Sequence, residues 1–291
     1  MILITGANGH LGSGVIDFLQ RKHPDVKPVA LVRSEEKGRA LKERGIGLRI
    51  GDYFNLDSLR AAMEGIDTLL FISSSNLQDR MTQHGNVIEA ANTSGVGHII
   101  YTSILHAADA SDNPIGSDHY QTEERIVSTG IPFTFFRNSF YADVLPMFMG
   151  PALETGQWAY ASGDEKVNFV VRMDIAEALA EVLADPEPHK KTIYEITGPE
   201  AYSFTQLARM LSDVVGRTIV YTELPLDVLE SNLEKAGLDE QTIAGAMAVA
   251  EVIRSGLLNA KDPVLGQLLG RRPTDMGEYL RQSVGKKNVR A

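Results

Sequence analysis

The chain begins Met1-Ile-Leu-Ile-Thr-Gly6-Ala-Asn-Gly9-His-Leu-Gly12, an apolar run followed at once by three glycines spaced three residues apart. The apolar run predicts a buried strand over Ile2–Thr5, and the periodic apolar residues that follow predict an amphipathic helix over residues 12–22. Glycines at such a junction permit a sharp turn, let the backbone approach a pyrophosphate and allow close packing of helix on strand. The N–H groups at the helix start favour phosphate. The segment therefore predicts a dinucleotide-binding turn; the alternative is a purely structural turn.

Short apolar runs and amphipathic stretches alternate along the first half, which is typical of a doubly wound parallel sheet of the Rossmann type in an α/β protein. Right-handed crossovers give the strand order 3-2-1-4-5-6, with a ligand crevice at the carboxyl ends of the strands. Four helices are expected to end at left-handed glycine caps, at Gly45, Gly65, Gly95 and Gly130. The expected strands are Ile2–Thr5, Val29–Arg33, Leu48–Ile50, Thr68–Ser73, His98–Ser103 and Phe133–Arg137, and the expected helices are 12–22, 35–44, 56–64, 80–94 and 119–129.

The patterning becomes less regular after about residue 138, and no repeat or low-complexity linker separates the two halves. We expect residues 1–138 to form the dinucleotide-binding domain and residues 139–291 to add late sheet strands and a smaller, mainly helical substrate lobe, with the cleft between them. The basic tail 286–291 is expected to be a frayed end. The expected late elements are a helix capped by Asp174 and ending at Leu183, a strand over Thr192–Thr197, a helix from Ser203 to Val215, a short strand over Thr218–Thr222 and mainly helical chain over 226–258.

Composition excludes several classes of function. The 291 residues include no cysteine, which rules out disulfides, thiolate metal sites and a cysteine nucleophile. No pair of histidines has zinc-ligand spacing with an acidic partner, so no metal is expected. The formal net charge of -10 disfavours nucleic acid and anionic membranes as partners. No apolar run reaches the roughly 18 residues of a membrane span, and the early first strand leaves no room for a signal peptide, which favours a cytoplasmic protein.

The end of the second strand indicates which cofactor is preferred. An acidic residue that binds the ribose hydroxyl of NAD is usual there, but this chain has Arg33, followed by Lys37 one turn into the next helix. A guanidinium can pair with a 2′-phosphate through two hydrogen bonds. The pattern therefore favours NADP(H) over NAD(H); the alternative is that Arg33 only ends a strand in solvent.

Two further strand ends carry candidate cofactor contacts. Asp52 and Tyr53 follow the third strand, where adenine usually lies, although Asp52 is equally suited to stabilise its own turn. Ser73, Ser74 and Ser75 end the fourth strand at the point where the strand order reverses. Small hydroxyl residues there leave room for the cofactor and supply hydrogen bonds to ribose.

Taken together, these segments resemble the short-chain dehydrogenase/reductase superfamily, and more closely its NmrA-like branch, which includes type 2 NAD(P)H:quinone oxidoreductases and triphenylmethane reductases. The resemblance covers essentially the whole chain. The matching pieces are Thr5–Gly12, Ala30–Arg33, Gly51–Tyr53, Leu70–Ser75, Gln83-His84 with Asn86-Val87, His98–Ser103, His119 with Thr122-Glu123, Ile131–Thr134 with Arg137-Asn138, and Thr197-Gly198.

The resemblance implies hydride transfer to quinones or cationic dyes. It also implies an NADPH site built from the glycine turn, Arg33, the serine segment and the stretch Arg137–Tyr141. Residue pattern and resemblance together give these candidate cofactor contacts: Gly6, Asn8, Gly9, His10, Leu11, Gly12, Arg33, Lys37, Asp52, Tyr53, Ser73, Ser74, Ser75, Thr102, Ser103, Arg137, Asn138, Ser139, Phe140 and Tyr141.

The catalytic residues are less clearly marked. The superfamily uses a serine and a tyrosine with a lysine four residues on, and Ser103 and Tyr120 stand in the corresponding places, but the fourth residue is Glu124. A carboxylate there raises the tyrosine pKa and makes it a poorer base. The candidate proton donors are therefore Tyr120 and His119; the alternative for His119 is a histidine satisfied by neighbouring backbone.

Aromatic residues follow the sixth strand and are placed to cover the nicotinamide. Phe148 and Trp158 are expected in a substrate pocket where a flat aromatic acceptor stacks, and the alternative is a core position between the two lobes. The leading hypothesis is an NADPH-dependent oxidoreductase acting on quinones or similar flat electrophiles, with a homodimer as a candidate assembly. The alternatives are a non-catalytic NADP(H) sensor and, less favoured, a nucleotide-sugar epimerase or reductase.

Overall fold

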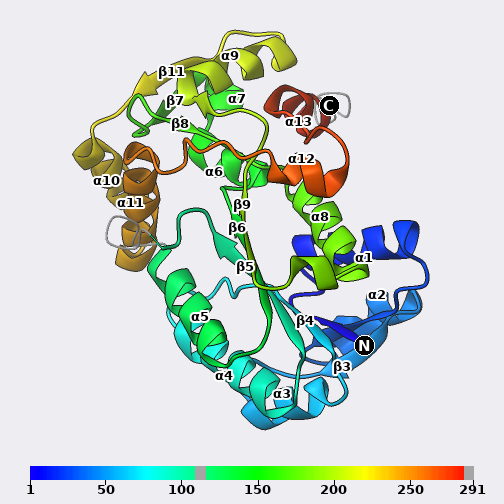
Figure 1. Ribbon diagram of the computed structural model, residues 1–291. Helices are drawn as coiled ribbons and strands as arrows, with labels where there is room; N and C mark the ends of the chain where they lie inside the picture. The colour runs from blue at the N-terminus through cyan, green and yellow to red at the C-terminus, as the bar shows by residue number, and fades with distance from the viewer. Residues whose placement is uncertain (109–115, 285–291) are drawn as a thin grey trace.

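The computed structural model describes residues 1–108 and 116–284. Its centre is a seven-stranded sheet in the order β3-β2-β1-β4-β5-β6-β9, in which every neighbouring pair is parallel (Figure 1). The predicted order of the first six strands is confirmed. The predicted late strand, β9, pairs with β6 at the edge of the sheet. The sheet strands are β1 (Ile2–Ile4), β2 (Pro28–Val32), β3 (Gly47–Ile50), β4 (Thr68–Phe71), β5 (His98–Ile104), β6 (Phe133–Asn138) and β9 (Thr192–Ile196).

Helices cover both faces of this sheet, as the doubly wound pattern requires (Figure 1). One face carries α1 (His10–Lys22), α2 (Glu35–Glu43), α8 (Arg172–Ala184) and α12 (Val264–Leu269), packed over a core that includes Ile16, Ile100 and Leu179. The opposite face carries α3 (Leu56–Met63), α4 (Arg80–Thr93) and α5 (Gly116–Ser128), packed over Leu69, Tyr101 and Phe135. The carboxyl ends of the strands therefore open toward the second half of the chain.

The second half builds a separate apolar core above that edge of the sheet, around Trp158, Phe204 and Leu211. Two small strand pairs frame it, one parallel and one antiparallel. Its elements are η1 (Ala142–Val144), α6 (Leu145–Met149), α7 (Ala152–Thr155), β7 (Gln157–Tyr160), β8 (Lys166–Val167), β10 (Tyr202–Ser203), α9 (Phe204–Val215), β11 (Val220–Glu223), α10 (Leu226–Lys235), α11 (Glu240–Arg254) and α13 (Met276–Ser283). The short η2 (Glu187–His189) instead joins α8 to β9 at the other edge of the sheet, where the His189 carbonyl accepts a hydrogen bond from Thr134.

The expected end signals of the helices are confirmed in most places. Gly45, Gly65, Gly95 and Gly130 all have φ between +71° and +79°, as left-handed caps require. Ser203 caps α9 through a reciprocal capping box with Gln206. The expected tail 286–291 lies outside the described residues. Among the described residues, no helix combines the length and the apolar character that crossing a bilayer demands.

The predicted N-cap at Asp174 is wrong. Helix α8 starts at Arg172, and Val171 stands at its N-cap without a side-chain hydrogen bond. The buried Asp174 carboxylate instead accepts hydrogen bonds from Arg271 and from the backbone N–H of Thr274. Because these partners lie about a hundred residues away in sequence, they were invisible to a reading of local patterns.

Candidate functional site

The turn after β1 has the geometry that its glycines predict. Gly6 has φ +59°, in the left-handed region. A Cβ on Gly12 would lie 2.4 Å from the Gly6 carbonyl oxygen, and one on Gly9 would lie 3.1 Å from the same atom. The chain therefore packs α1 tightly on the turn, with the helix N-terminus at the carboxyl edge of the sheet.

A groove of about 600 Å³ runs from this turn across the ends of β2, β3 and β4. It brings together many of the expected cofactor contacts, among them Arg33 and Lys37, whose positive charges offset the acidic balance of the chain locally. Its lining is Gly6, Ala7, Asn8, Gly9, Leu31, Val32, Arg33, Lys37, Gly51, Asp52, Tyr53, Phe54, Ile72, Ser73, Ser74, Ser75, Asn76 and Gln83.

Several lining residues also form hydrogen bonds with other parts of the chain. The Asn8 side-chain amide donates to the Lys37 carbonyl at 2.8 Å, which links the glycine turn to α2. Asp52 accepts a hydrogen bond from the Phe54 backbone N–H at 2.9 Å, so it stabilises its own turn as well as lining the groove. The Tyr53 hydroxyl donates to the Ile72 carbonyl at 3.2 Å. The groove is thus held open by contacts of its own.

A second hollow of about 260 Å³ lies at the ends of β5 and β6, and Ser73 lines both spaces. None of its described lining residues carries an Asp, Glu, Lys or Arg side chain. Phe148 belongs to it as expected, whereas Val144, Met147 and Val249 were missed because they come from η1, α6 and α11. The lining is Ser73, Ser103, Ile104, His119, Asn138, Ser139, Phe140, Tyr141, Val144, Met147, Phe148 and Val249.

Three polar atoms at this second hollow, here called the acceptor cavity, have no partner among the described residues. They are Ser103 Oγ, Asn138 Oδ1 and Ser139 Oγ, and all three are buried. A buried polar atom without a hydrogen bond costs about 1–3 kcal/mol. Three such atoms at one cavity fit a site whose bound molecule supplies the missing hydrogen bonds, as the amide and ribose of a nicotinamide cofactor can.

His119 lines the acceptor cavity and is 7% exposed. Its Nδ1 lies 2.8 Å from the Tyr101 hydroxyl. Burial, the nearby charge of Arg80 and the neighbouring His84 hold the pKa of His119 well below its usual range, so the ring is neutral near pH 7. Tyr120, the other expected proton donor, is half-buried on α5 and does not line the cavity.

Four expected contacts are instead engaged within the protein itself. Arg137 forms ion pairs with Glu123 at 2.6 Å and Glu195 at 3.1 Å, and lines neither space. Trp158 is fully buried in the core of the second half, where Nε1 donates to the Phe148 carbonyl at 2.7 Å. Leu11 belongs to the core beneath α1, and Thr102 Oγ1 accepts a hydrogen bond from the Ser73 backbone N–H at 2.9 Å.

His10 faces a neighbouring surface hollow beside the start of α1. Gly12 lies under the turn rather than in the lining of the groove. Within residues 1–108 and 116–284, no cluster of three or more His, Asp or Glu side chains is placed to hold a metal ion.

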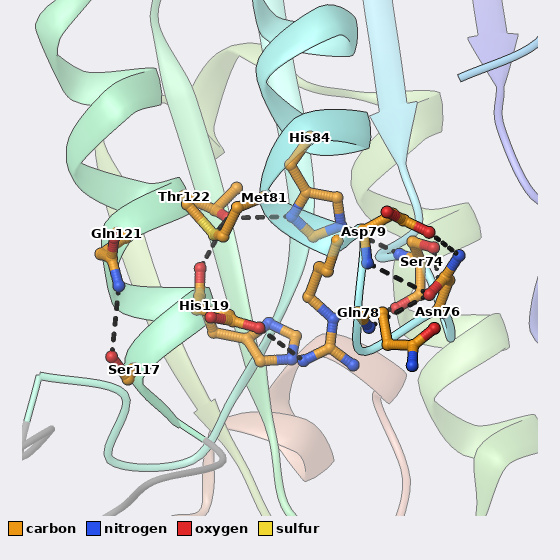
Figure 2. Close-up of polar contacts among 12 residues, drawn as sticks. Ser74, Asn76, Gln78, Asp79, Met81, His84, Ser117, His119, Gln121 and Thr122 are labelled. Carbon is orange, nitrogen blue, oxygen red and sulfur yellow. Dashed lines mark hydrogen bonds and ion pairs between the residues drawn. The ribbon is translucent and has the colours of Figure 1, made fainter. Parts of the chain in front are cut away.

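The matching pieces include His84 and Thr122, but sequence reasoning assigned them no role and did not point to Arg80; Figure 2 shows how His84 and Thr122 lie. His84, on α4, accepts the Ser74 backbone N–H at 3.0 Å and contacts Thr122 Oγ1 of α5 at 2.9 Å. Arg80 Nε donates to the Ser74 carbonyl at 3.1 Å. These contacts attach the serine segment to both helices. Tyr101, whose ring contacts both His84 and His119, offered one signal. It stands two residues before Ser103 and therefore on the same face of β5.

Comparison with known proteins identifies the family. The model of the NmrA-like family matches residues 1–280. The chain belongs to the NmrA-like family. This NmrA-like chain is 37% identical to quinone oxidoreductase 2 of Escherichia coli over 96% of each protein. It is 31% identical to an NAD(P)H azoreductase of Xenophilus azovorans over 85% of each.

Solved structures agree with this assignment. The NADPH complex of the NADPH-dependent quinone oxidoreductase of Escherichia coli matches the NmrA-like chain with a TM-score of 0.91 and 35% identity, covering 99% of this chain and 100% of the other. The triphenylmethane reductase of a Citrobacter species, complexed with NADP(H), matches with a TM-score of 0.90 and 33% identity, covering 97% and 100%. The predicted family and fold are confirmed.

Proposed function

We propose that this protein is an NADPH-dependent oxidoreductase that reduces quinones or similar flat aromatic electrophiles. The observation that carries the proposal is the continuity of two different spaces. A polar groove with two cations joins, at Ser73, an acceptor cavity with apolar and aromatic walls. The named activities and bound cofactors of the similar reductases support this function.

The groove residues orient the cofactor, which supplies a hydride when bound. The glycine turn and the start of α1 would hold the pyrophosphate, and Arg33 and Lys37 would hold the 2′-phosphate. The unpartnered atoms of Ser103, Asn138 and Ser139 would hydrogen-bond the nicotinamide end. These contacts would hold the hydride-donating end of the cofactor against the acceptor, and positioning of this kind lowers the barrier to transfer.

The acceptor cavity would bind its substrate mainly through aromatic and apolar contacts, unlike the polar groove that binds the cofactor. Phe140 and Phe148 supply aromatic surface on which a flat ring would stack, and Tyr141, whose ring Arg172 covers on one side, adds to the mostly apolar walls. The neutral His119 is placed to hydrogen-bond an acceptor oxygen as negative charge develops on it. A reduced quinone is a stabilised phenolate that solvent can protonate, so the chemistry does not require the lysine that Glu124 replaces.

The direct test is NADPH oxidation with a simple benzoquinone, with NADH in parallel. We expect turnover that prefers NADPH, and we expect Arg33→Ala to lose that preference because a 2′-phosphate partner is removed. Lys42→Ala, on the next helix but outside the groove, serves as the matched charge control. Tight NADPH binding without turnover on any quinone or dye would instead identify a sensor and contradict the proposal.

A further inference from the structure

Two buried histidines face the ring of Tyr101 from different helices. His84 comes from α4 and His119 from α5, with ring centroids 5.8 Å and 5.9 Å from that of Tyr101. Tyr101 itself is fully buried on β5. Each histidine makes hydrogen bonds that restrict where its ring proton can lie.

The tautomer of His84 follows from its partners (Figure 2). The Ser74 backbone N–H can only donate, and it points at Nε2 at 3.0 Å, so this nitrogen must accept. The proton of the neutral ring then lies on Nδ1 and is donated to Thr122 Oγ1 at 2.9 Å. The Thr122 hydroxyl in turn donates a hydrogen bond to the Asp118 carbonyl at 2.7 Å, so every donor in this chain has an acceptor.

His119 is arranged in the opposite sense. The Tyr101 hydroxyl lies 2.8 Å from His119 Nδ1 and also interacts with the Thr122 hydroxyl. Thr122 Oγ1 already accepts from His84 Nδ1 and donates to the Asp118 carbonyl, which leaves His119 Nδ1 as the acceptor for the phenol proton. Tyr101 therefore donates to Nδ1, and the ring proton lies on Nε2, which has no partner among the described residues and belongs to a ring that lines the acceptor cavity.

The surrounding charges keep both rings neutral. Arg80 is 7% exposed, and its closest carboxylate oxygen, on Asp118, is 3.8 Å away. Burial and the cation of Arg80 lower the pKa of His84 to about 3, with a smaller contribution from Arg125, and the pKa of His119 falls for the same first two reasons. Glu123, on the same helix as His119, is engaged by Arg137.

We infer that Tyr101 is a positioning residue that fixes His119 as the Nε2–H tautomer, so that a neutral N–H faces the acceptor oxygen, while His84 is held as the Nδ1–H tautomer. The inference rests on the proposed function for its catalytic meaning. A neutral N–H stabilises developing negative charge without giving up its proton. His84 meanwhile holds the Ser74 backbone at the junction of the groove and the acceptor cavity.

The first experiment is long-range ¹H–¹⁵N NMR of the full chain labelled in its histidine rings, with His84→Gln and His119→Asn used for assignment. We expect opposite neutral tautomers: the proton on Nδ1 for His84 and on Nε2 for His119, at all pH values near neutrality. A proton on His119 Nδ1, or the same tautomer at both positions, would overturn the inference. This readout requires no turnover, so it is decided separately from the proposed function.

The second experiment compares Tyr101→Phe with Tyr194→Phe. Tyr194 on β9 makes the same kind of contact, 2.7 Å from hydroxyl to His189 Nδ1, away from the acceptor cavity. Tyr101→Phe should reduce kcat for benzoquinone about tenfold, leave the KM for NADPH unchanged and allow mixed His119 tautomers in the NMR spectrum. Tyr194→Phe should change none of these. Equal kinetics and spectra in the two variants would remove the positioning role, whereas a wild-type protein that never reduces quinones would overturn the proposed function alone.

Discussion

At the scale of single residues, the tightest constraint lies in the turn that begins the groove. A methyl group on Gly12 would press on backbone atoms, 2.4 Å from the Gly6 oxygen and 2.8 Å from the Ala7 Cα, which cannot move aside as a flexible side chain would. We therefore expect Gly12→Ala to lower the free energy of unfolding by about 1–3 kcal/mol or more and to weaken NADPH binding.

Urea unfolding with and without NADPH measures both effects of this change. Gly245→Ala is the matched control, since that glycine lies in α11 and no atom stands within 4 Å of the place its added methyl group would take. There the same change should be neutral or slightly stabilising. Equal stability of the two variants would show that the turn is looser than its geometry indicates.

Arg137 gives a second residue-scale prediction. Its side chain is 12% exposed and its partner Glu123 is 2% exposed, so loss of the cation strands a buried carboxylate. Arg137→Met should lower the free energy of unfolding by about 3–5 kcal/mol. Thermal or urea unfolding measures this, alongside the NADPH affinity of the folded fraction. Unchanged stability together with weakened NADPH affinity would contradict this prediction and would support the cofactor contact that the sequence analysis expects for Arg137.

Sequence reasoning found site residues where the signal was local. The glycine turn, Arg33 and the serine segment follow directly on strand ends, and parallel strands bring their carboxyl ends to one edge. Arg137 also stands near that edge, but its partners Glu123 and Glu195 lie 14 and 58 residues away in sequence. Only the folded structure shows that these two carboxylates form ion pairs with the Arg137 guanidinium.

At the scale of elements, α1, α8 and the segment after α12 are joined by a network of ion pairs. Glu177 of α8 contacts both Arg271 and Lys22. Burial alone would raise the pKa of Glu177, but the hydrogen bonds from Arg271 and Lys22 bring it below its ordinary value of 4.5. The carboxylate therefore stabilises the fold at pH values above its unfolded pKa, and this contribution is lost as the pH falls through the folded pKa.

We expect the Tm of the wild type to fall on acidification below about pH 4.5 more steeply than that of Glu177→Gln, which has no such proton to bind. Scanning calorimetry over a pH series checks this. Glu230→Gln, an exposed change on α10, controls for the general loss of a negative charge. Parallel curves for wild type and Glu177→Gln would mean that the network contributes nothing to acid stability.

The same network explains which elements were predictable. The six regular strands and their helices follow from periodicity and from crossover handedness. The start of α8 did not, because Asp174 resembles a cap in the sequence but is used by Arg271 in the fold. Val249 was missed for a related reason: nothing local indicates that α11 contributes to the acceptor cavity.

At the scale of the whole molecule, one ligand is expected to span the groove and reach the acceptor cavity. Binding only to the folded state adds stability of RT ln(1 + [L]/Kd), or about 2.7 kcal/mol at one hundred times Kd. NADPH should therefore raise the Tm by several degrees, and by more than NADH at equal concentration, because of Arg33 and Lys37. Differential scanning fluorimetry with both cofactors checks this, and equal shifts would contradict the assigned 2′-phosphate site.

The last strand of the sheet also has a consequence for synthesis. Strand β9 pairs with β6 from Thr134↔Thr192 to Asn138↔Ile196, yet it follows β6 by about 54 residues of chain. At roughly 5–20 residues per second, a translating ribosome takes several seconds to deliver it. During that interval the nascent sheet has an unpaired edge at β6, which can template wrong pairings. We therefore expect the nascent chain to be prone to aggregation in those seconds and to benefit from a chaperone that covers this edge.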